Sequence, residues 1–272
     1  MLFRSASLDV EKEAARWDAP VVGVGRIRLV GAGPGDPRLL TVAALEAIEE
    51  ADLVIADRLV PDAILGMVRG ELVLAGEKHR GSDADAAQAM IDARIVAAAL
   101  AGRDVVRLHV GDPSLFGRLS ETLAAVEGAG LEAEIIPGVS ALSALGVPLT
   151  SRGSASRVLV ASARRAGGRA EELPAFDAEL TLALFMAAGS RAQVAAGLRE
   201  RGWPADWPVL AVSRASQPDE LRQHATVGTL AGLEVPAPAV IVVGRVGAWE
   251  RPGGEALLPA RRASGRPAPT AR

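Results

Sequence analysis

The sequence predicts an α/β protein made of two α/β domains with a cleft between them. Three observations support this fold class. Short β-branched runs alternate with alanine- and leucine-rich stretches, the alternation occurs in two series, and a segment with proline and glycine separates the series. With 272 residues, of which 49% are apolar, the chain is long enough for two such cores.

The first series alternates strands with helices, which favours a largely parallel sheet. Each expected strand is a short run rich in Val, Ile and Leu, and each expected helix is rich in Ala and Leu. The expected strands are 25–30, 52–56, 72–75, 104–108 and 133–136, and the expected helices are 41–50, about 84–101 and about 119–128.

The second series has strand-like runs of the same kind and one clear helical stretch. Ser190 is a candidate N-cap for that helix. The expected strands are 157–161, 180–185, 209–212 and 239–243, and the expected helix is 191–201. We therefore expect an N-terminal domain at 26–147, a linker at 148–153 and a C-terminal domain at 154–249, with mobile tails at 1–25 and 250–272.

Composition excludes several classes of protein. The chain has no cysteine, which rules out disulfides, thiolate metal sites and cysteine nucleophiles, and its three histidines leave little for a metal cage, so we expect no metal. A net charge of −3 argues against nucleic acid as a partner. Its apolar runs are too short to cross a membrane, and residues 1–20 have no signal-like apolar region, so we expect a cytoplasmic protein.

Two glycine-rich turns follow expected strands. The first, at 31–36, precedes a helix, as in dinucleotide-binding folds, and Asp57 stands where a ribose-binding acid belongs. Pro34 lacks the N–H that a phosphate cradle uses, and Asp36 replaces the third glycine, which disfavours NAD. The second turn, at 109–117, follows a buried-looking strand, where open α/β sheets bind ligands.

Five motifs occur in order and at characteristic spacings: VGAGPGDPRLLT, ADLVIADRLV, VVRLHVGDPSLFG, IIPGVSA and PLTSRG. Together they resemble the tetrapyrrole methylases that use S-adenosylmethionine, and the resemblance covers about residues 26–248. It implies two α/β domains with S-adenosylmethionine folded into the cleft between them, S-adenosylhomocysteine as product, a tetrapyrrole substrate and a homodimer.

Within the family, the first two motifs are most similar to uroporphyrinogen-III C-methyltransferases, which add two methyl groups to form precorrin-2 on the way to sirohaem and cobalamin. The segments RLHVGDPSLFG and SRASQPDE look more like precorrin-4 C11-methyltransferases. We favour the first reading. Related enzymes that modify RNA are disfavoured by the acidic composition. A relative that modifies a protein stays open, and so does a relative that binds without turnover, because of the altered glycine loop.

The resemblance also assigns roles to positions. Asp57 matches the proton acceptor, and Lys78, one place later than the family's lysine, is the second catalytic candidate. In the cofactor loop, Val110 stands where the family has glycine. The cofactor-binding positions are Pro34, Val110, Gly111, Asp112, Leu115, Ser140, Ala141, Met186, Ala215, Pro238 and Ala239.

Arginine supplies nearly all of the basic residues: 30 Lys and Arg less the two lysines, Lys12 and Lys78, leaves 28. Genome base composition is the simpler explanation for most of this excess. The substrate that the resemblance implies carries acetate and propionate arms, which fixed guanidinium groups bind well. The candidates for substrate binding stand in or beside the motif loops and are Arg58, Arg118, Arg152 and Arg214.

Overall fold

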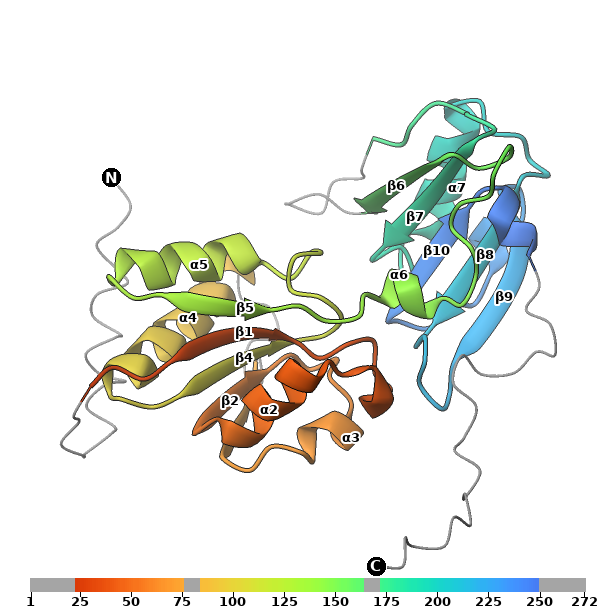
Figure 1. Ribbon diagram of the computed structural model, residues 1–272. Coiled ribbons are helices and arrows are strands. Elements are labelled where there is room, and N and C mark those ends of the chain that lie inside the picture. Colours follow the sequence, from red (N-terminus) through yellow and green to blue (C-terminus); the bar gives the residue numbers. More distant parts are fainter. Residues whose placement is uncertain (1–22, 76–83, 164–171, 250–272) are drawn as a thin grey trace, which may run out of the picture.

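The computed structural model describes residues 23–75, 84–163 and 172–249, which form two lobes, each built on a five-stranded sheet (Figure 1). The first lobe contains β1 (Ile27–Gly31), η1 (Pro37–Leu39), α2 (Val42–Glu50), β2 (Leu53–Ala56), α3 (Asp62–Leu65), β3 (Glu71–Leu74), α4 (Ala84–Leu100), β4 (Val105–His109), α5 (Leu119–Gly128) and β5 (Ala133–Ile136). The second lobe contains α6 (Ala141–Ala144), β6 (Arg157–Ser162), β7 (Leu180–Phe185), α7 (Arg191–Glu200), β8 (Pro208–Ser213), β9 (Leu221–Thr226), η3 (Leu230–Gly232), β10 (Ala239–Val243) and η4 (Arg245–Ala248).

The first sheet is parallel throughout, in the order β3-β2-β4-β1-β5. Helices cover both faces: α2 and α3 bury Ile48 and Ile64 against one face, while α4 and α5 bury Ile95 and Val126 against the other. Strands buried on both sides are near-continuous apolar runs, as in β2, whose four residues are all buried. The expected parallel sheet is confirmed.

The second sheet is mixed, in the order β6-β7-β10-β8-β9. The pair β6 and β7 is parallel, whereas β10 runs antiparallel to both of its neighbours and β9 runs antiparallel to β8. Sequence analysis did not predict β9, because its residues, LRQHAT, have no apolar run and lie at a sheet edge, half exposed.

The connection between the sheets packs with the second lobe. Helix α6 begins after Ser140, whose hydroxyl accepts a hydrogen bond from the Leu142 N–H at 3.2 Å. Ala144 and Leu145 are buried in a cluster with residues of β8 and β10, so α6 belongs to the second core although it precedes the expected linker at 148–153.

Ser190 stands at the N-cap of α7, but its hydroxyl makes no capping hydrogen bond.

Among the described residues, no helix is both long and apolar enough to span a bilayer.

Candidate active site

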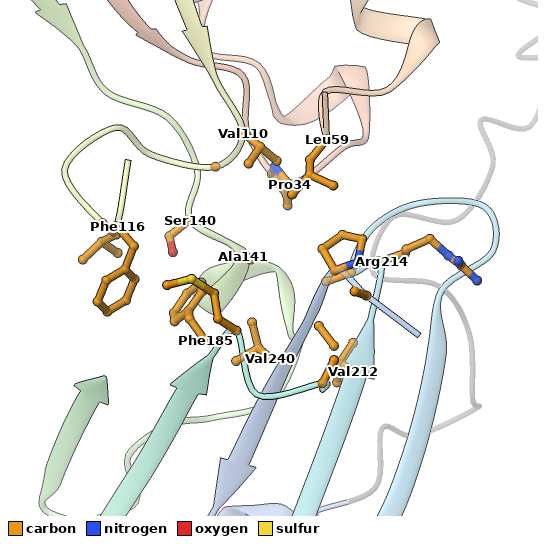
Figure 2. Close-up of a pocket in the computed structure, with 18 of the residues that line it drawn as sticks. Pro34, Leu59, Val110, Phe116, Ser140, Ala141, Phe185, Val212, Arg214 and Val240 are labelled. Carbon is orange, nitrogen blue, oxygen red and sulfur yellow. The ribbon is translucent and has the colours of Figure 1, made fainter. Parts of the chain in front are cut away.

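A cavity of about 590 Å³ lies between the lobes. Its walls come from the loops that follow β1, β2, β4, β5, β7 and β8 and from the start of β10. Figure 2 shows Pro34 and Val110 of the first lobe facing Phe185 and Val240 of the second across this space. Its volume is in the range of pockets that enclose a small organic ligand.

The structure brings together every position to which the resemblance gives a cofactor role: all eleven line this one cavity. They come from segments up to 205 residues apart, from Pro34 to Ala239, which meet because strand ends of both sheets point into the same space. The lining residues that sequence reasoning did not assign to the site are Leu59, Phe116, Gly117, Phe185, Ala188, Gly189, Val212, Gln217, Ala237 and Val240.

Asp57 lies on the cavity wall directly after β2, held by a neighbouring strand. Its Oδ1 accepts a short hydrogen bond from Arg107 Nη2, and its Oδ2 accepts from the Val110 N–H at 3.3 Å. Arg107 is 3% exposed and also donates to the carbonyl of Ile55 at 3.1 Å. Asp57 therefore pairs with Arg107 and not with its chain neighbour Arg58. The arginine inside the apolar run VVRLH is the sequence signal for a buried partner carboxylate.

His109 is fully buried behind this wall, with its Nδ1 3.9 Å from Asp57 Oδ2, and neither ring nitrogen has a hydrogen-bond partner in the structure. Burial, reinforced by the charge of Arg107, lowers the pKa of His109 to about 4. The imidazole is therefore neutral near pH 7. His109 is thus the last residue of β4, packed beneath the loop.

Asp112 fixes the shape of the loop after β4. Its Oδ1 accepts from the Ser114 N–H at 2.9 Å and from the Ser114 hydroxyl, and its Oδ2 accepts from the Gly138 N–H at 2.9 Å. Burial alone would raise the pKa of Asp112, but these hydrogen bonds outweigh it and the pKa is lowered. Asp112 thus serves both as a lining residue and as the acid that closes its own turn.

Three lining residues other than glycine have left-handed backbone conformations: Phe116, Met186 and Arg214, with φ of 60°, 57° and 47°. This conformation costs a non-glycine residue energy and collects at functional sites. Gly111, with φ of 72°, has open space where a Cβ would stand, so backbone faces the cavity directly there. The rings of Phe116 and Phe185 meet at 5.2 Å between centroids and join the lobes on one side.

The first turn does not lead into a long helix. Asp36 instead caps the three-residue η1, accepting from the Arg38 N–H at 2.8 Å, and α2 starts only at Val42 after its N-cap Thr41. A dinucleotide site needs a helix N-terminus at this turn to hold the pyrophosphate, and the structure places none there.

Of the four arginines proposed for substrate binding, only Arg214 lines the cavity. Arg58 is exposed between two lining residues, Asp57 and Leu59. Arg118 pairs with Asp85 at 2.6 Å and Glu121 at 2.9 Å, and Arg152 is exposed in the connection. The structure therefore does not gather all four in one pocket. Lys78 lies outside the described residues.

Comparison with known proteins gives one family for this chain. The family model for tetrapyrrole (corrin/porphyrin) methylases matches residues 26–231. A uroporphyrinogen-III C-methyltransferase of Paracoccus denitrificans is 40% identical over 237 residues, which are 83% of each chain. Sirohaem synthases match as well, and the chain spans about half of their length.

Solved structures of similar proteins point to the same family. The uroporphyrin-III C-methyl transferase of Thermus thermophilus, crystallised with S-adenyl homocysteine, is 38% identical, with a TM-score of 0.73 over 82% of this chain and 93% of that one. A cobalt precorrin-4 methyltransferase from cobalamin biosynthesis is 26% identical, with a TM-score of 0.68 over 80% of this chain and 94% of that one. On the match to the family model and the 40% identity, the chain belongs to the tetrapyrrole (corrin/porphyrin) methylase family.

Proposed function

We propose that the chain is an S-adenosylmethionine-dependent methyltransferase that adds two methyl groups to carbons of uroporphyrinogen III, giving precorrin-2 for sirohaem or cobalamin synthesis. The observation that carries this proposal is the cavity: eleven positions assigned to the cofactor by motif resemblance line one space between the lobes. The relatives named for this activity, at 40% and 38% identity, support the same substrate.

The cavity residues fit the cofactor that the family uses. The lining is mainly apolar, the backbone at Gly111 faces open space, and Met186 offers a polarisable thioether, so an adenosine and an alkyl sulfonium could be enclosed. Pro34, Val110, Ala141 and Ala215 would surround the ligand. When bound, S-adenosylmethionine supplies a methyl group that is already activated.

The protein's own residues would align the substrate and accept a proton. An apolar cavity excludes water and holds the reacting carbon in line, which are large terms in a methyl transfer that needs no metal. Arg107 and the Val110 N–H hold the Asp57 carboxylate at the wall. We propose Asp57 as acceptor of the proton that the methylated ring loses, with Lys78 as a second catalytic candidate.

The acidic arms of the substrate radiate from its macrocycle, so their anchors need not lie inside the cofactor cavity. We propose that Arg214 on the wall and Arg58 on the exposed stretch beside it bind carboxylate arms, with Arg118 and Arg152 as outer candidates. A homodimer and a cytoplasmic location are part of the same proposal, which the family resemblance supports.

Mass spectrometry tests the reaction. The chain is incubated anaerobically with S-adenosylmethionine and either uroporphyrinogen III or precorrin-4. A gain of two methyl groups on uroporphyrinogen III supports the proposal. A gain on precorrin-4 alone supports the second candidate, which is favoured by the segment RLHVGDPSLFG and by the 26% identical relative. Tight cofactor binding with no methylated product contradicts both.

A further inference from the structure

The loop after β8, residues 214–217, reaches from the second lobe to the first. Gln217 Nε2 donates to the Pro34 carbonyl at 3.2 Å, and the Ser216 hydroxyl accepts from the Asp36 N–H at 3.2 Å. Both first-lobe groups belong to the backbone of the turn after β1. These two hydrogen bonds, named the clasp below, join the lobes beside the cavity, which Pro34 and Gln217 both line.

Close packing accompanies the hydrogen bonds. Gly35 lies between the two bonded residues of the turn, with φ of 141°, and a Cβ at this position would stand 2.5 Å from Gln217 Cγ. The Gln217 side chain therefore rests directly on the Gly35 backbone. Glycine here permits both the positive φ and the approach of the second lobe.

The loop is preformed by contacts within the second lobe. Arg214 and Ser216 have φ of 47° and 69°, which non-glycine residues adopt only when their surroundings hold them. Glu220 holds the backbone of Ser216: its Oε2 accepts a hydrogen bond from the Ser216 N–H at 2.7 Å. Its Oε1 in turn accepts from Arg222 at 3.1 Å. A loop fixed in this way presents its two polar side chains to the first lobe with little further loss of entropy.

The clasp has a counterpart of different chemistry on the other side of the cavity. There the rings of Phe116 and Phe185 meet, as Figure 2 shows, while Pro34 and Arg214 lie at the opposite side. An apolar ring contact tolerates sliding, whereas a hydrogen bond requires a fixed distance and direction. The clasp therefore restrains the distance between the lobes at its side more tightly than the ring contact does at the other.

We propose that Ser216 and Gln217 are positioning residues that latch the lobes across the cofactor cavity and slow the release of bound S-adenosylhomocysteine. This inference rests on the proposed function, because it needs that ligand in the cavity. One net hydrogen bond corresponds to about a twofold to tenfold change in an equilibrium constant, so each half of the clasp should have an effect of that size.

Gln217→Met tests the latch, because methionine keeps the length and packing of the side chain and removes its N–H donor. Gln223→Met is the matched control: Gln223 Nε2 donates to the Glu234 carbonyl at 2.7 Å, wholly within the second lobe. We expect Gln217→Met to speed S-adenosylhomocysteine dissociation about twofold to tenfold in stopped-flow measurements, and Gln223→Met to leave the rate at its wild-type value. An unchanged rate in Gln217→Met, or equal changes in both variants, overturns the proposal.

A second measurement needs no ligand. Because the chain has no cysteine, spin labels can be attached at Val42→Cys on α2 and Ala231→Cys on η3, both exposed. Gln217→Met should broaden the distance distribution between the labels in ligand-free protein, and Gln223→Met should not. If wild type binds no S-adenosylhomocysteine, the proposed function fails while this distribution still tests the latch. An identical distribution in all three proteins overturns it.

Discussion

The two walls of the cavity differ in what they contribute. The first-lobe wall carries two carboxylates, each fixed by hydrogen bonds: Asp57 by Arg107 and Asp112 by Ser114. The second-lobe wall is largely apolar, with Met186 and Phe185 at the end of β7. The carboxylates thus come from the first lobe, whereas the second lobe contributes mainly apolar surface together with Arg214.

Sheet topology explains the difference. In the parallel first sheet, every strand sends its carboxyl end to the same edge, so polar loops converge there. In the mixed second sheet, β10 runs the other way and enters the cavity wall at its start, with Pro238 and Ala239, which offer small apolar groups and backbone. Substitutions in the first wall should therefore change the catalytic rate and the ordering of the loops. Substitutions in the second wall should change how well the ligand packs.

The largest expected effect is on Asp57. Asp57→Asn keeps the shape but removes the base, and should lower kcat for methyl transfer by about 10²- to 10⁴-fold with S-adenosylhomocysteine affinity nearly unchanged. Asp52→Asn is the control. Asp52 directly precedes the first residue of β2, and its carboxylate accepts a hydrogen bond from the Asp104 N–H at 2.8 Å. Steady-state kinetics and calorimetric titration measure the two quantities. Retention of wild-type kcat in Asp57→Asn would remove Asp57 from the mechanism.

Asp112 should show the next largest effect, on binding. Asp112→Asn loses charge-assisted acceptance from Ser114 and Gly138, so the loop at the cavity loosens, and we expect the Kd for S-adenosylhomocysteine to rise about tenfold to a hundredfold. Asp177→Asn is the matched control, since Asp177 accepts from the Glu179 N–H at 2.9 Å in a turn outside the cavity lining. Equal Kd values for both variants would contradict the role of Asp112.

His109 tests the electrostatics behind the first wall. Its folded pKa of about 4 is below the ordinary value of 6.5, so between these pH values the unfolded chain binds a proton that the folded protein does not. Stability from this group is complete above pH 6.5 and falls with acidification, by on the order of 2 kcal/mol from pH 7 to pH 5. The free energy of unfolding of His109→Gln, measured with urea, should therefore fall less than that of wild type between about pH 7 and pH 5. If the unfolding free energies of wild type and His109→Gln changed equally with pH, His109 would not be a neutral buried group.

The smallest expected effect is on the second wall. Met186 has φ of 57°, so Met186→Gly should relieve strain and raise stability by less than about 1 kcal/mol. The lost apolar contact should weaken S-adenosylhomocysteine binding by about twofold to fivefold. Met186→Ala separates the two causes, because alanine shortens the side chain and keeps the strain. If Met186→Gly were no more stable than Met186→Ala, the strain argument would fail.

Much of the fold was predictable because its signals are local. The strands β1, β2, β4 and β5 are mostly apolar runs between turn residues, and their alternation with helices favours a parallel sheet. The edge strand β9 has no such run, and its partner β8 stabilises it through backbone hydrogen bonds that the sequence does not display. The direction of β10 was equally hidden, because an apolar strand reads alike in both directions.

The sequence by itself determined which chemical groups are present: it has no thiols and few imidazoles. It also displayed the glycine-rich turns after strands and the five motifs that indicate the family. Only the tertiary structure decided which groups meet. It paired Asp57 with Arg107, fifty residues away, and placed Gln217 on Gly35 of the other lobe. The physical reason is that spacing along a chain governs contacts within a helix or turn, whereas partners across a sheet or cleft depend on strand order and register.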